Sequence, residues 1–347
     1  MMHWKDNAAF TQHEDVVAVG DEALGYKALI GIHSTALGPA VGGCRIWTYD
    51  SDDDALTDVL RLSRGMSYKN AMADLPLGGG KAVIYKMGAA REATFEAFGK
   101  AVDALGGRYI TAEDVGASVA DMRAIRRSTP YVAGLPSEDG HAGGDPSPWT
   151  ALGVFVSIKA LLGGSVQNRS VVVQGVGSVG FNLCKLLADE GAKLIVADVN
   201  QDNLARAKTL GAEIGEPDRI HEVEADLFSP CALGAGLNAD TIPHLGAPIV
   251  CGAANNQLAT EADGVRLMKR GVTYAPDYVV NAGGIINVCA EYLDEPAEVV
   301  DGRIRAIADR LLHVLETAKQ HGEPPGVAAD RIARARIDAA RQNKERA

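Results

Sequence analysis

Three consecutive glycines run directly into a lysine near the end of the first quarter of the chain. Gly78–Gly80 precede Lys81, and an apolar segment follows. No ordinary turn needs three glycines, so we expect the backbone here to approach another group closely. A lysine fixed beside such a stretch is a candidate catalytic amine, because burial and a nearby positive charge lower the pKa of an amine. A glycine-rich hairpin carrying a solvated lysine is the alternative interpretation.

A second lysine lies just ahead of these glycines. The apolar spacing predicts a helix over about 52–74, and Lys69 falls in its last part. Leu37–Arg45 forms a second glycine-rich turn, with Gly42 and Gly43 at its centre, and it ends in a cation. We therefore expect the two glycine turns and the two lysines to converge on one pocket.

The segment Tyr109–Gly116 is predicted to be a strand that ends in acids and a turn, with Asp114 at the strand end. A carboxylate at a strand end is well placed for a site. An aspartate shortly before a helix, here one beginning near Val119, is equally often only a helix cap.

The second half of the chain contains a nucleotide-binding pattern. A buried strand, Ser170–Gln174, leads into Gly175-Val176-Gly177-Ser178-Val179-Gly180 and then into a helical run. Asp198 ends the next predicted strand, 23 residues after Gly175. Strand, glycine motif, helix and acid in this order are the dinucleotide fingerprint. A carboxylate at Asp198 would bind the adenosine ribose and repel a 2′-phosphate, so NAD is favoured over NADP. The alternative is a glycine turn in an unrelated βαβ unit.

Two asparagines follow later strands of the same predicted sheet. Strands are expected at 224–228, 248–252 and 272–274, with Ala253 and Asn255 after the second and Asn281 after the third. Ligands of such sheets bind at strand ends. Buried amides are costly unless they form hydrogen bonds, and a nicotinamide carboxamide or a substrate amine would satisfy them. Turn asparagines are the alternative.

The predicted fold class is α/β with two domains, since 347 residues exceed what one small core usually organises. Residues 134–148 hold the densest cluster of glycines and prolines, so the boundary is placed there. We expect an N-terminal α/β substrate and oligomerisation domain over 1–135, joined by a C-terminal helix at about 325–347. A Rossmann-type NAD-binding domain over 145–320 would follow, with a cleft between the domains. Shorter elements are expected as strands at 15–19 and 28–33 and as helices at 90–104, 302–320 and 328–345.

Composition excludes several classes of partner. The net charge of −11 argues against nucleic acid, whose phosphates need a basic surface. The sequence contains no run of about 18 apolar residues, so we expect no membrane span. The five cysteines are odd in number and lack metal-like spacing, so we expect no metal and a reducing, cytoplasmic compartment.

These motifs together resemble the amino-acid dehydrogenases of the glutamate/leucine/phenylalanine/valine superfamily, and among them the leucine dehydrogenases most. The matching stretches are Leu37–Tyr49, Leu60–Ile84, Tyr109–Met122, Asp145–Gly153, Val173–Asp198, Pro230–Leu237, Gly252–Leu258 and Tyr274–Val288. The most specific are Gly-Gly-Gly-Lys and Thr-Ala-Glu-Asp-Val-Gly. Trp149 and Gly180 depart modestly from the family pattern.

The resemblance implies roles for individual residues. Lys69, with the backbone of Gly42 and Gly43, would bind the substrate carboxylate. Lys81 would act as general base and acid on the water that attacks the iminium carbon, and Asp114 would handle the substrate amine. The remaining implied contacts are Asn255 with substrate and nicotinamide, Asp145, Thr150 and Asn281 near the cofactor, and Val41, Met66, Ala112, Ile285 and Val288 around the substrate.

The implied reaction is the reversible, NAD-dependent oxidative deamination of leucine, isoleucine or valine to the 2-oxo acid and ammonia. Glutamate enzymes have a lysine where this chain has Val41 and a small hydroxyl residue where it has Val288, so a side-chain carboxylate would be left unpaired. The branched Ile285 favours these substrates over phenylalanine. A homo-oligomer is also implied.

Three alternatives remain open. One is a phenylalanine dehydrogenase, and another is a non-catalytic NAD-binding regulatory protein, which predicts a damaged lysine pair. The third is a hydroxy-acid dehydrogenase, for which His141 is the histidine to test.

Overall fold

The computed structural model describes residues 3–135, 142–232 and 234–346. The chain divides into two compact units, of which the first contains Met1–Asp145, Val288–Ala297 and Ala333–Ala347. The second contains Pro146–Asn287 and Glu298–Ile332. Two segments differ from the expected domain limits: 288–297 belongs to the first unit, and residues 325–332 of the last helix belong to the second.

A five-stranded mixed sheet forms the centre of the first unit, in the order β1-β2-β4-β3-β5. Its strands are β1 (Asp15–Asp21), β2 (Tyr26–Ser34), β3 (Ala40–Ile46), β4 (Gly78–Lys86) and β5 (Tyr109–Glu113). The β1–β2 and β2–β4 pairs are antiparallel, whereas β3 runs parallel to both β4 and β5. The prediction of a glycine-rich turn at Leu37–Arg45 was therefore wrong for most of its length. Its glycines lie inside the sheet, where a Cβ on Gly42 would stand 1.8 Å from the Gly80 carbonyl oxygen.

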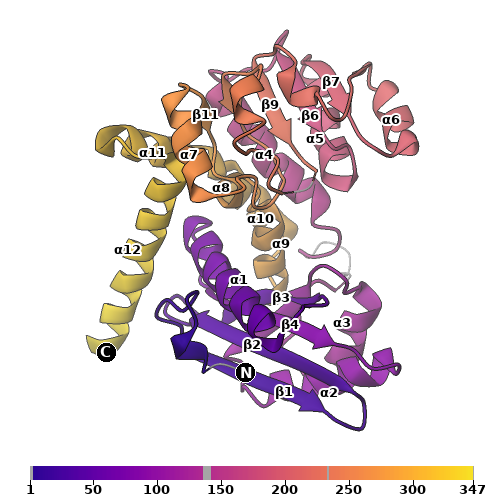
Figure 1. Ribbon diagram of the computed structural model, residues 1–347, viewed down its shortest axis with the longest axis vertical. Helices are drawn as coiled ribbons and strands as arrows, with labels where there is room; N and C mark the ends of the chain where they lie inside the picture. Colours follow the sequence, from indigo (N-terminus) through magenta and orange to yellow (C-terminus); the bar gives the residue numbers. More distant parts are fainter. Residues whose placement is uncertain (1–2, 136–141, 233, 347) are drawn as a thin grey trace. The chain divides into compact units, whose positions relative to one another are not determined.

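Helices cover both faces of this sheet (Figure 1). They are α1 (Asp52–Met72), α2 (Arg91–Asp103) and α3 (Val119–Arg126). Leu56, Val59 and Leu60 of α1 pack against Leu29 and Val83 on one face. On the other face, Phe95 and Phe98 of α2 and Met122 and Ile125 of α3 pack against Ile30, Ala82 and Ile84. The side chain of Ser51 accepts from the backbone N–H of Asp54 and so begins α1 where the sequence indicated.

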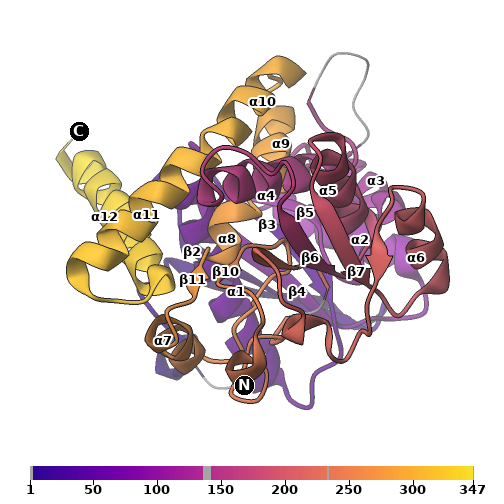
Figure 2. The same cartoon turned by 90° about the horizontal axis from the view of Figure 1, so that it is seen from above.

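The second unit is built on a six-stranded sheet in the order β11-β10-β9-β6-β7-β8, with all neighbouring strands parallel. The strands are β6 (Ser170–Gln174), β7 (Lys193–Ala197), β8 (Glu213–Ile214), β9 (Leu227–Pro230), β10 (Ile249–Val250) and β11 (Thr273–Tyr274). Figure 2 shows this sheet with its helices from a second direction. Strand β6 lies between β7 and β9, so the chain order reverses beside it, which is where ligands of doubly wound sheets bind.

The remaining helices belong to the second unit or continue from it. They are α4 (Ser147–Leu161), α5 (Ser178–Asp189), α6 (Gln201–Lys208), α7 (Glu261–Lys269), α8 (Asp277–Val280), α9 (Gly283–Tyr292), α10 (Ala297–Arg305), α11 (Ile307–His321) and α12 (Pro325–Arg346). Within the described parts of the chain, no helix is both long enough and apolar enough to cross a membrane.

Three predicted elements need correction. The strand expected at 224–228 begins only at Leu227, because the Asp226 carboxylate accepts from the backbone N–H and the hydroxyl of Ser170. The single helix expected at 302–320 is two helices, α10 and α11, with Ala306 between them. Asn281 follows the short helix α8 rather than a strand end.

Candidate functional site

The three glycines before Lys81 begin β4, in the interior of the sheet of the first unit. A Cβ on Gly79 would stand 2.0 Å from the backbone nitrogen of Ser67 in α1, and one on Gly80 would stand 2.8 Å from the Tyr109 ring. A Cβ on Gly78 would meet the Ser34 carbonyl oxygen at 2.0 Å. At these three positions the close approach that the sequence indicated is an approach of protein to protein. The hairpin alternative is excluded, because β4 pairs with β2 and β3.

Lys81 is buried on the face of the sheet that α1 covers. Side chains alternate along a strand, and Val83, two residues later, packs against α1. Only 5% of Lys81 is exposed, so it is not the solvated lysine of the alternative interpretation. Its Nζ lies 3.0 Å from Oδ2 of Asp114. Burial lowers the pKa of Lys81, the Asp114 carboxylate opposes this, and the Arg45 guanidinium lowers the pKa further, so that the net direction is downward.

Asp114 stands at the end of β5 and binds two cations. Its Oδ2 accepts from Nε of Arg45 at 3.0 Å in addition to its contact with Lys81. Although burial raises the pKa of this carboxyl, Lys81 and Arg45 together hold it below its usual range. Asp114 does not cap α3: that helix begins at Ser118, whose side chain forms a capping box with Asp121.

Arg45 is the functional candidate that sequence reasoning missed. It was noted only as the cation that ends a glycine-rich segment. Its contact with Asp114 joins residues 69 positions apart, so no local pattern reveals it.

The other predicted substrate residues of the first unit lie around the ends of β3 and β5. Gly43 is paired with Ala112, and a Cβ on Gly43 would stand 2.8 Å from the Cβ of Asp114. The Met66 side chain lies beside Gly42, because a Cβ on Gly42 would stand 3.2 Å from Cγ of Met66. Further predicted positions have these placements: Val41 and Ala112 are buried, Lys69 is partly buried in the last turn of α1, Val288 is partly buried in α9 of the first unit, and Ile285 is partly buried in the second unit.

The glycine motif of the second unit turns from β6 into α5. Gly175 has φ +89°, a left-handed conformation that favours glycine, and a Cβ on Gly180 would stand 2.0 Å from the Gly175 carbonyl oxygen. Gly177 is the N-cap of α5, and a Cβ there would meet no atom within 4 Å. An open glycine at the start of a 12-residue helix fits a bound pyrophosphate, which approaches the backbone and is favoured by the helix N-terminus. Ser178 and Val179 form the first turn of this helix.

Asp198 follows β7 and closes this turn. Its Oδ2 accepts from the backbone N–H of Val176 at 2.8 Å and from Nδ2 of Asn203 at 3.2 Å, and its Oδ1 accepts from the backbone N–H of Asn200 at 2.8 Å. Partial burial raises the pKa of this carboxyl, but these N–H donors hold it below its usual range. The structure therefore keeps a negative charge next to the glycine turn. Asn203 is a second residue that the sequence did not reveal.

Asn255 and Asn281 contact each other, and a backbone carbonyl fixes how both amides are oriented. Nδ2 of Asn281 donates to the Ala253 carbonyl oxygen at 3.1 Å and to Oδ1 of Asn255 at 2.9 Å. A carbonyl oxygen only accepts, so the amide nitrogen of Asn281 must face Ala253, and its second hydrogen faces Asn255. Asn255 therefore contributes its oxygen to this contact and keeps its amide nitrogen as a donor.

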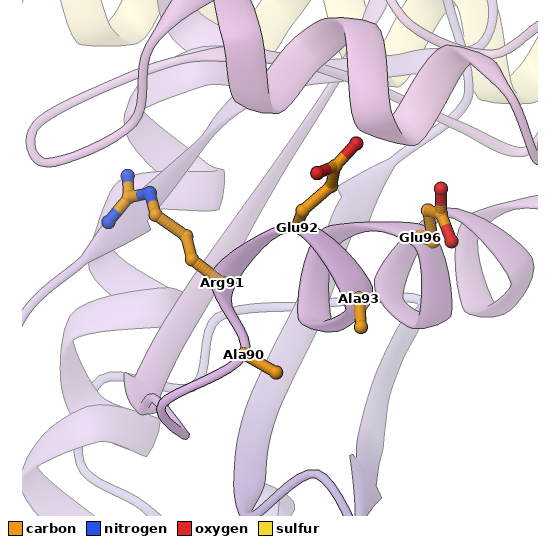
Figure 3. A pocket seen from close by; sticks show the side chains of 5 residues that line it. All are labelled: Ala90, Arg91, Glu92, Ala93 and Glu96. Atoms are coloured by element: carbon orange, nitrogen blue, oxygen red, sulfur yellow. The ribbon is translucent and has the colours of Figure 1, made fainter.

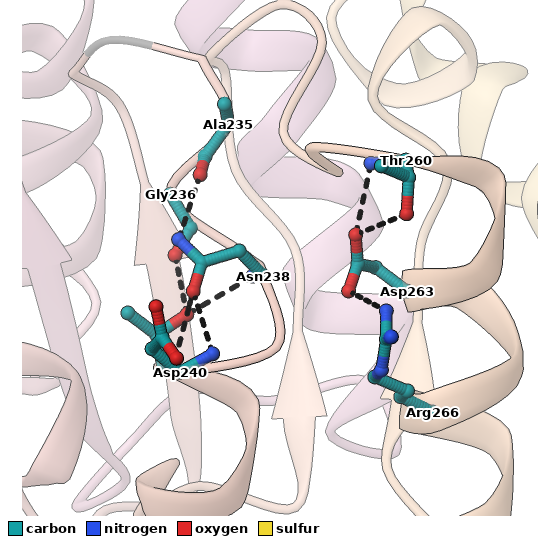
Figure 4. A network of polar contacts seen from close by, with 8 residues as sticks. Ala235, Gly236, Asn238, Asp240, Thr260, Asp263 and Arg266 are labelled. Atoms are coloured by element: carbon teal, nitrogen blue, oxygen red, sulfur yellow. Dashed lines mark hydrogen bonds and ion pairs between the residues drawn. The ribbon is translucent and has the colours of Figure 1, made fainter.

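The segment that holds Asn255 is bonded to residues 235–237 just after the asparagine. The backbone of Ala235 donates to the Asn256 carbonyl at 2.7 Å, and that of Leu237 donates to the Gln257 carbonyl at 3.0 Å. Figure 4 shows the turn around Asn238 beside the cap of α7, in which Asp263 bonds Thr260 and Arg266. The exposed Asn255 thus extends from a segment that is fixed by hydrogen bonds.

Thr150 packs against the segment that follows Asn281. A Cβ on Gly284 would stand 2.9 Å from the Thr150 hydroxyl oxygen, and one on Gly283 would stand 1.9 Å from the Trp149 carbonyl oxygen. The structure thus brings Thr150 and residues 281–284 together. Asp145 is exposed and ends the first segment of the first unit.

Other features carry no chemistry of this kind. A hollow of about 430 Å³ at the start of α2 is lined by Ala90, Arg91, Glu92, Ala93 and Glu96, none of them a predicted site residue (Figure 3). Arg91 is already paired with Asp121 at 2.7 Å. His141 lies outside the described residues. Among the residues that are described, no group of three histidine, cysteine or acidic side chains is arranged to hold a metal ion.

Comparisons with known proteins identify the family of the chain. Residues 13–131 match the family model described as "Glu/Leu/Phe/Val dehydrogenase, dimerisation domain", and residues 196–344 match "Glutamate/Leucine/Phenylalanine/Valine dehydrogenase". The chain is 49% identical to a leucine dehydrogenase of Thermoactinomyces intermedius over 96% of this chain and 93% of that protein. It is 45% identical to a valine dehydrogenase of Streptomyces virginiae over 95% of each.

A solved structure is also similar. The crystal structure of L-tryptophan dehydrogenase from Nostoc punctiforme matches with a TM-score of 0.86 and 42% identity, covering 95% of this chain and 97% of that one. Sequence and fold therefore agree over almost the whole length, and the chain belongs to the glutamate/leucine/phenylalanine/valine dehydrogenase family of amino-acid dehydrogenases.

Proposed function

We propose that this protein catalyses the reversible, NAD-dependent oxidative deamination of a branched-chain aliphatic L-amino acid to its 2-oxo acid and ammonia. The single observation that carries the proposal is the contact between the buried Lys81 and the partly buried Asp114, with Nζ and Oδ2 3.0 Å apart. Burial and Arg45 lower the pKa of this lysine against the opposing effect of Asp114, so a larger fraction of it is the free amine that a general base must be.

Each residue then has one task. Lys69 binds the substrate carboxylate, and Asp114 accepts a proton from the substrate amine. The chemistry that a bound nicotinamide supplies is acceptance of the hydride that leaves Cα. Lys81 takes a proton from the water that adds to the resulting iminium carbon, and it returns that proton to the nitrogen that leaves as ammonia. It then takes the remaining hydroxyl proton as the carbonyl of the 2-oxo acid forms.

Aliphatic side chains favour a branched-chain substrate. Val41, Ala112, Ile285 and Val288 offer no cation to a side-chain carboxylate, so glutamate would leave its charge unpaired at a cost of several kcal/mol. The leucine and valine dehydrogenases among the relatives support this class. Because a tryptophan dehydrogenase is also similar, aromatic substrates, phenylalanine included, form the second candidate.

NAD is proposed over NADP because of Asp198. Donors from Val176, Asn200 and Asn203 keep this carboxylate ionised beside the glycine turn. A negative charge there bonds ribose hydroxyls and repels a 2′-phosphate.

Two broader expectations accompany this function. A homo-oligomer is supported by the match of residues 13–131 to a family model described as a dimerisation domain. A cytoplasmic location is proposed because all five cysteines are free thiols, four of them buried.

The test is a panel of kcat/KM values measured by NADH formation. Leucine, isoleucine and valine should exceed phenylalanine and tryptophan by about tenfold, and glutamate by far more. The kcat/KM measured with NAD should exceed the value measured with NADP. The absence of NADH with any amino acid would support the non-catalytic alternative, and a preference for an aromatic substrate would support the second candidate.

A further inference from the structure

Arg45 joins the candidate catalytic pair to a second set of polar residues. Its Nε donates to Oδ2 of Asp114 at 3.0 Å, and its NH1 donates to Oδ2 of Asp58 in α1 at 3.1 Å. The hydroxyl of Tyr49 donates to the same oxygen of Asp58. One planar guanidinium thus bridges two carboxylates from different elements, a geometry that a lysine cannot reproduce.

The strands place Arg45 on the same face of the sheet as Lys81. Arg45 is aligned with Val83 of β4, and Val83 packs against α1 two residues beyond Lys81. Both cations reach the same oxygen of Asp114, at 3.0 Å each. The position of the Asp114 carboxylate is therefore set jointly by a candidate catalytic amine and by an arginine that is always charged.

We propose that Arg45, held by Asp58 and Tyr49, is a positioning residue of the deamination reaction that aims Asp114 and keeps Lys81 available as a free amine. This inference rests on the roles proposed above for Lys81 and Asp114. Arg45 touches neither substrate nor cofactor in this scheme and acts only through the pair.

The electrostatics around Lys81 support this role. The ionisable groups that act on the lysine are Asp114 after β5 and Arg45 and Cys44 of β3. Burial lowers the pKa of Lys81, Asp114 raises it, and Arg45 lowers it. Burial raises the pKa of the Cys44 thiol, so this neighbour remains uncharged. Without Arg45, the pKa of Lys81 would be higher, because Asp114 would act on the lysine with no opposing positive charge.

The test is the pH dependence of kcat for oxidative deamination, in which the acid limb reports deprotonation of Lys81. Arg45→Met should move this limb to higher pH by about one unit, so the rate below the limb falls about tenfold. Arg45→Lys keeps the charge and should leave the limb close to its original position, with a lower kcat because the double contact is lost. The position of a limb does not depend on how much of a variant folds.

Arg127→Met is the matched control. Arg127 also bridges two carboxylates, Glu92 and Glu96, but on the surface beside α2. The acid limb of kcat in Arg127→Met should stay at its original pH. An unmoved limb in Arg45→Met, even with reduced kcat, would overturn the inference, because a merely structural arginine predicts that result. A Lys81→Ala variant with normal kcat would instead overturn the proposed catalytic mechanism, and the Arg45 inference with it.

Discussion

Individual residues of this protein differ in how far the sequence alone could identify them. Lys81, Asp114 and Asp198 follow glycine-rich or strand-end patterns that occupy a short stretch of chain, and the structure places all three among hydrogen-bond or ion-pair partners. Arg45 contacts Asp114, 69 positions away, and a partner that far along the chain leaves no signal in local spacing. Asn203 lies only five residues after Asp198, but the glycine motif and the acid that marked this region gave no reason to select it.

At the residue scale, the contact between Asn281 and Asn255 makes a sharp prediction. Asn281→Asp removes the amide hydrogens that bond Ala253 and Asn255, so the Asn255 amide loses the contact that orients it. KM for the amino acid or for NAD should rise about tenfold or more, the cost of a buried polar group left without its partner.

Asn238→Asp is the control for this substitution, measured in the same steady-state assay. Asn238 uses its Oδ1 to accept from the backbone of Asp240 and Thr241, and an aspartate retains that oxygen. The substitution removes the bond from Nδ2 of Asn238 to the Ala235 carbonyl, so it controls for the loss of an amide donor elsewhere in the second unit. Unchanged KM values in Asn281→Asp would contradict the proposed orientation of Asn255.

At the scale of elements, the sequence predicted most helices and strands, but it did not always predict the role of the glycines within them. The glycines at 42–43 indicated a turn, yet they lie in β3, because a missing Cβ serves close strand packing as well as it serves a turn. The strand, glycine motif and acid of the second unit were predictable because they occupy one continuous stretch that ends at Asp198. The strands β10 and β11 lie within the segments expected at 248–252 and 272–274, whereas β8, which was not expected, has two residues, too few for any period to show.

The packing of α1 on β4 depends on Gly79. A Cβ there would stand 2.0 Å from the backbone nitrogen of Ser67. A backbone atom has no alternative rotamer, so this clash could be relieved only by moving the helix or the strand. Gly79→Ala should therefore lower the free energy of unfolding by about 3 kcal/mol or more. The measurement is urea unfolding followed by circular dichroism.

Gly65→Ala, in the same helix, is the control for Gly79→Ala. A Cβ at Gly65 would meet no atom within 4 Å, and alanine favours a helix, so this variant should be more stable by about 0.5–1 kcal/mol. Equal stability of the two variants would show that α1 does not lie on the sheet as described.

For the whole molecule, two buried histidines of the first unit make stability depend on pH. His13 and His33 stack edge to face 4.7 Å apart, His13 bonds the Leu60 carbonyl, and His33 bonds the Ser67 hydroxyl. Burial lowers the pKa of His13 to about 4 and that of His33 to about 3. The ionisable neighbours that act on them are His13 and Arg341 for His33 and Arg64 for both histidines, and each of these neighbours lowers the pKa.

Because both folded pKa values lie below the unfolded value of about 6.5, the unfolded chain binds these protons first as pH falls. The contribution of these histidines should be fully present above pH 6.5 and should be lost from there down to about pH 4 for His13 and about pH 3 for His33, by up to about 3 kcal/mol for His13. A His13→Gln/His33→Gln double variant should show a flatter decline in thermal unfolding between these pH values. His313→Gln, at an exposed position, is the control, and equal slopes in all three proteins would contradict the prediction.

The measurement that tests the central claim most directly is a comparison of Lys81→Ala with Lys69→Ala. Steady-state NADH formation would be combined with calorimetric binding of NAD and of the amino acid. Lys81→Ala should bind both ligands and lose kcat by a factor of about 10²–10⁴, because only proton transfer is removed. Lys69→Ala should mainly raise KM. Near-normal kcat in Lys81→Ala would contradict the account.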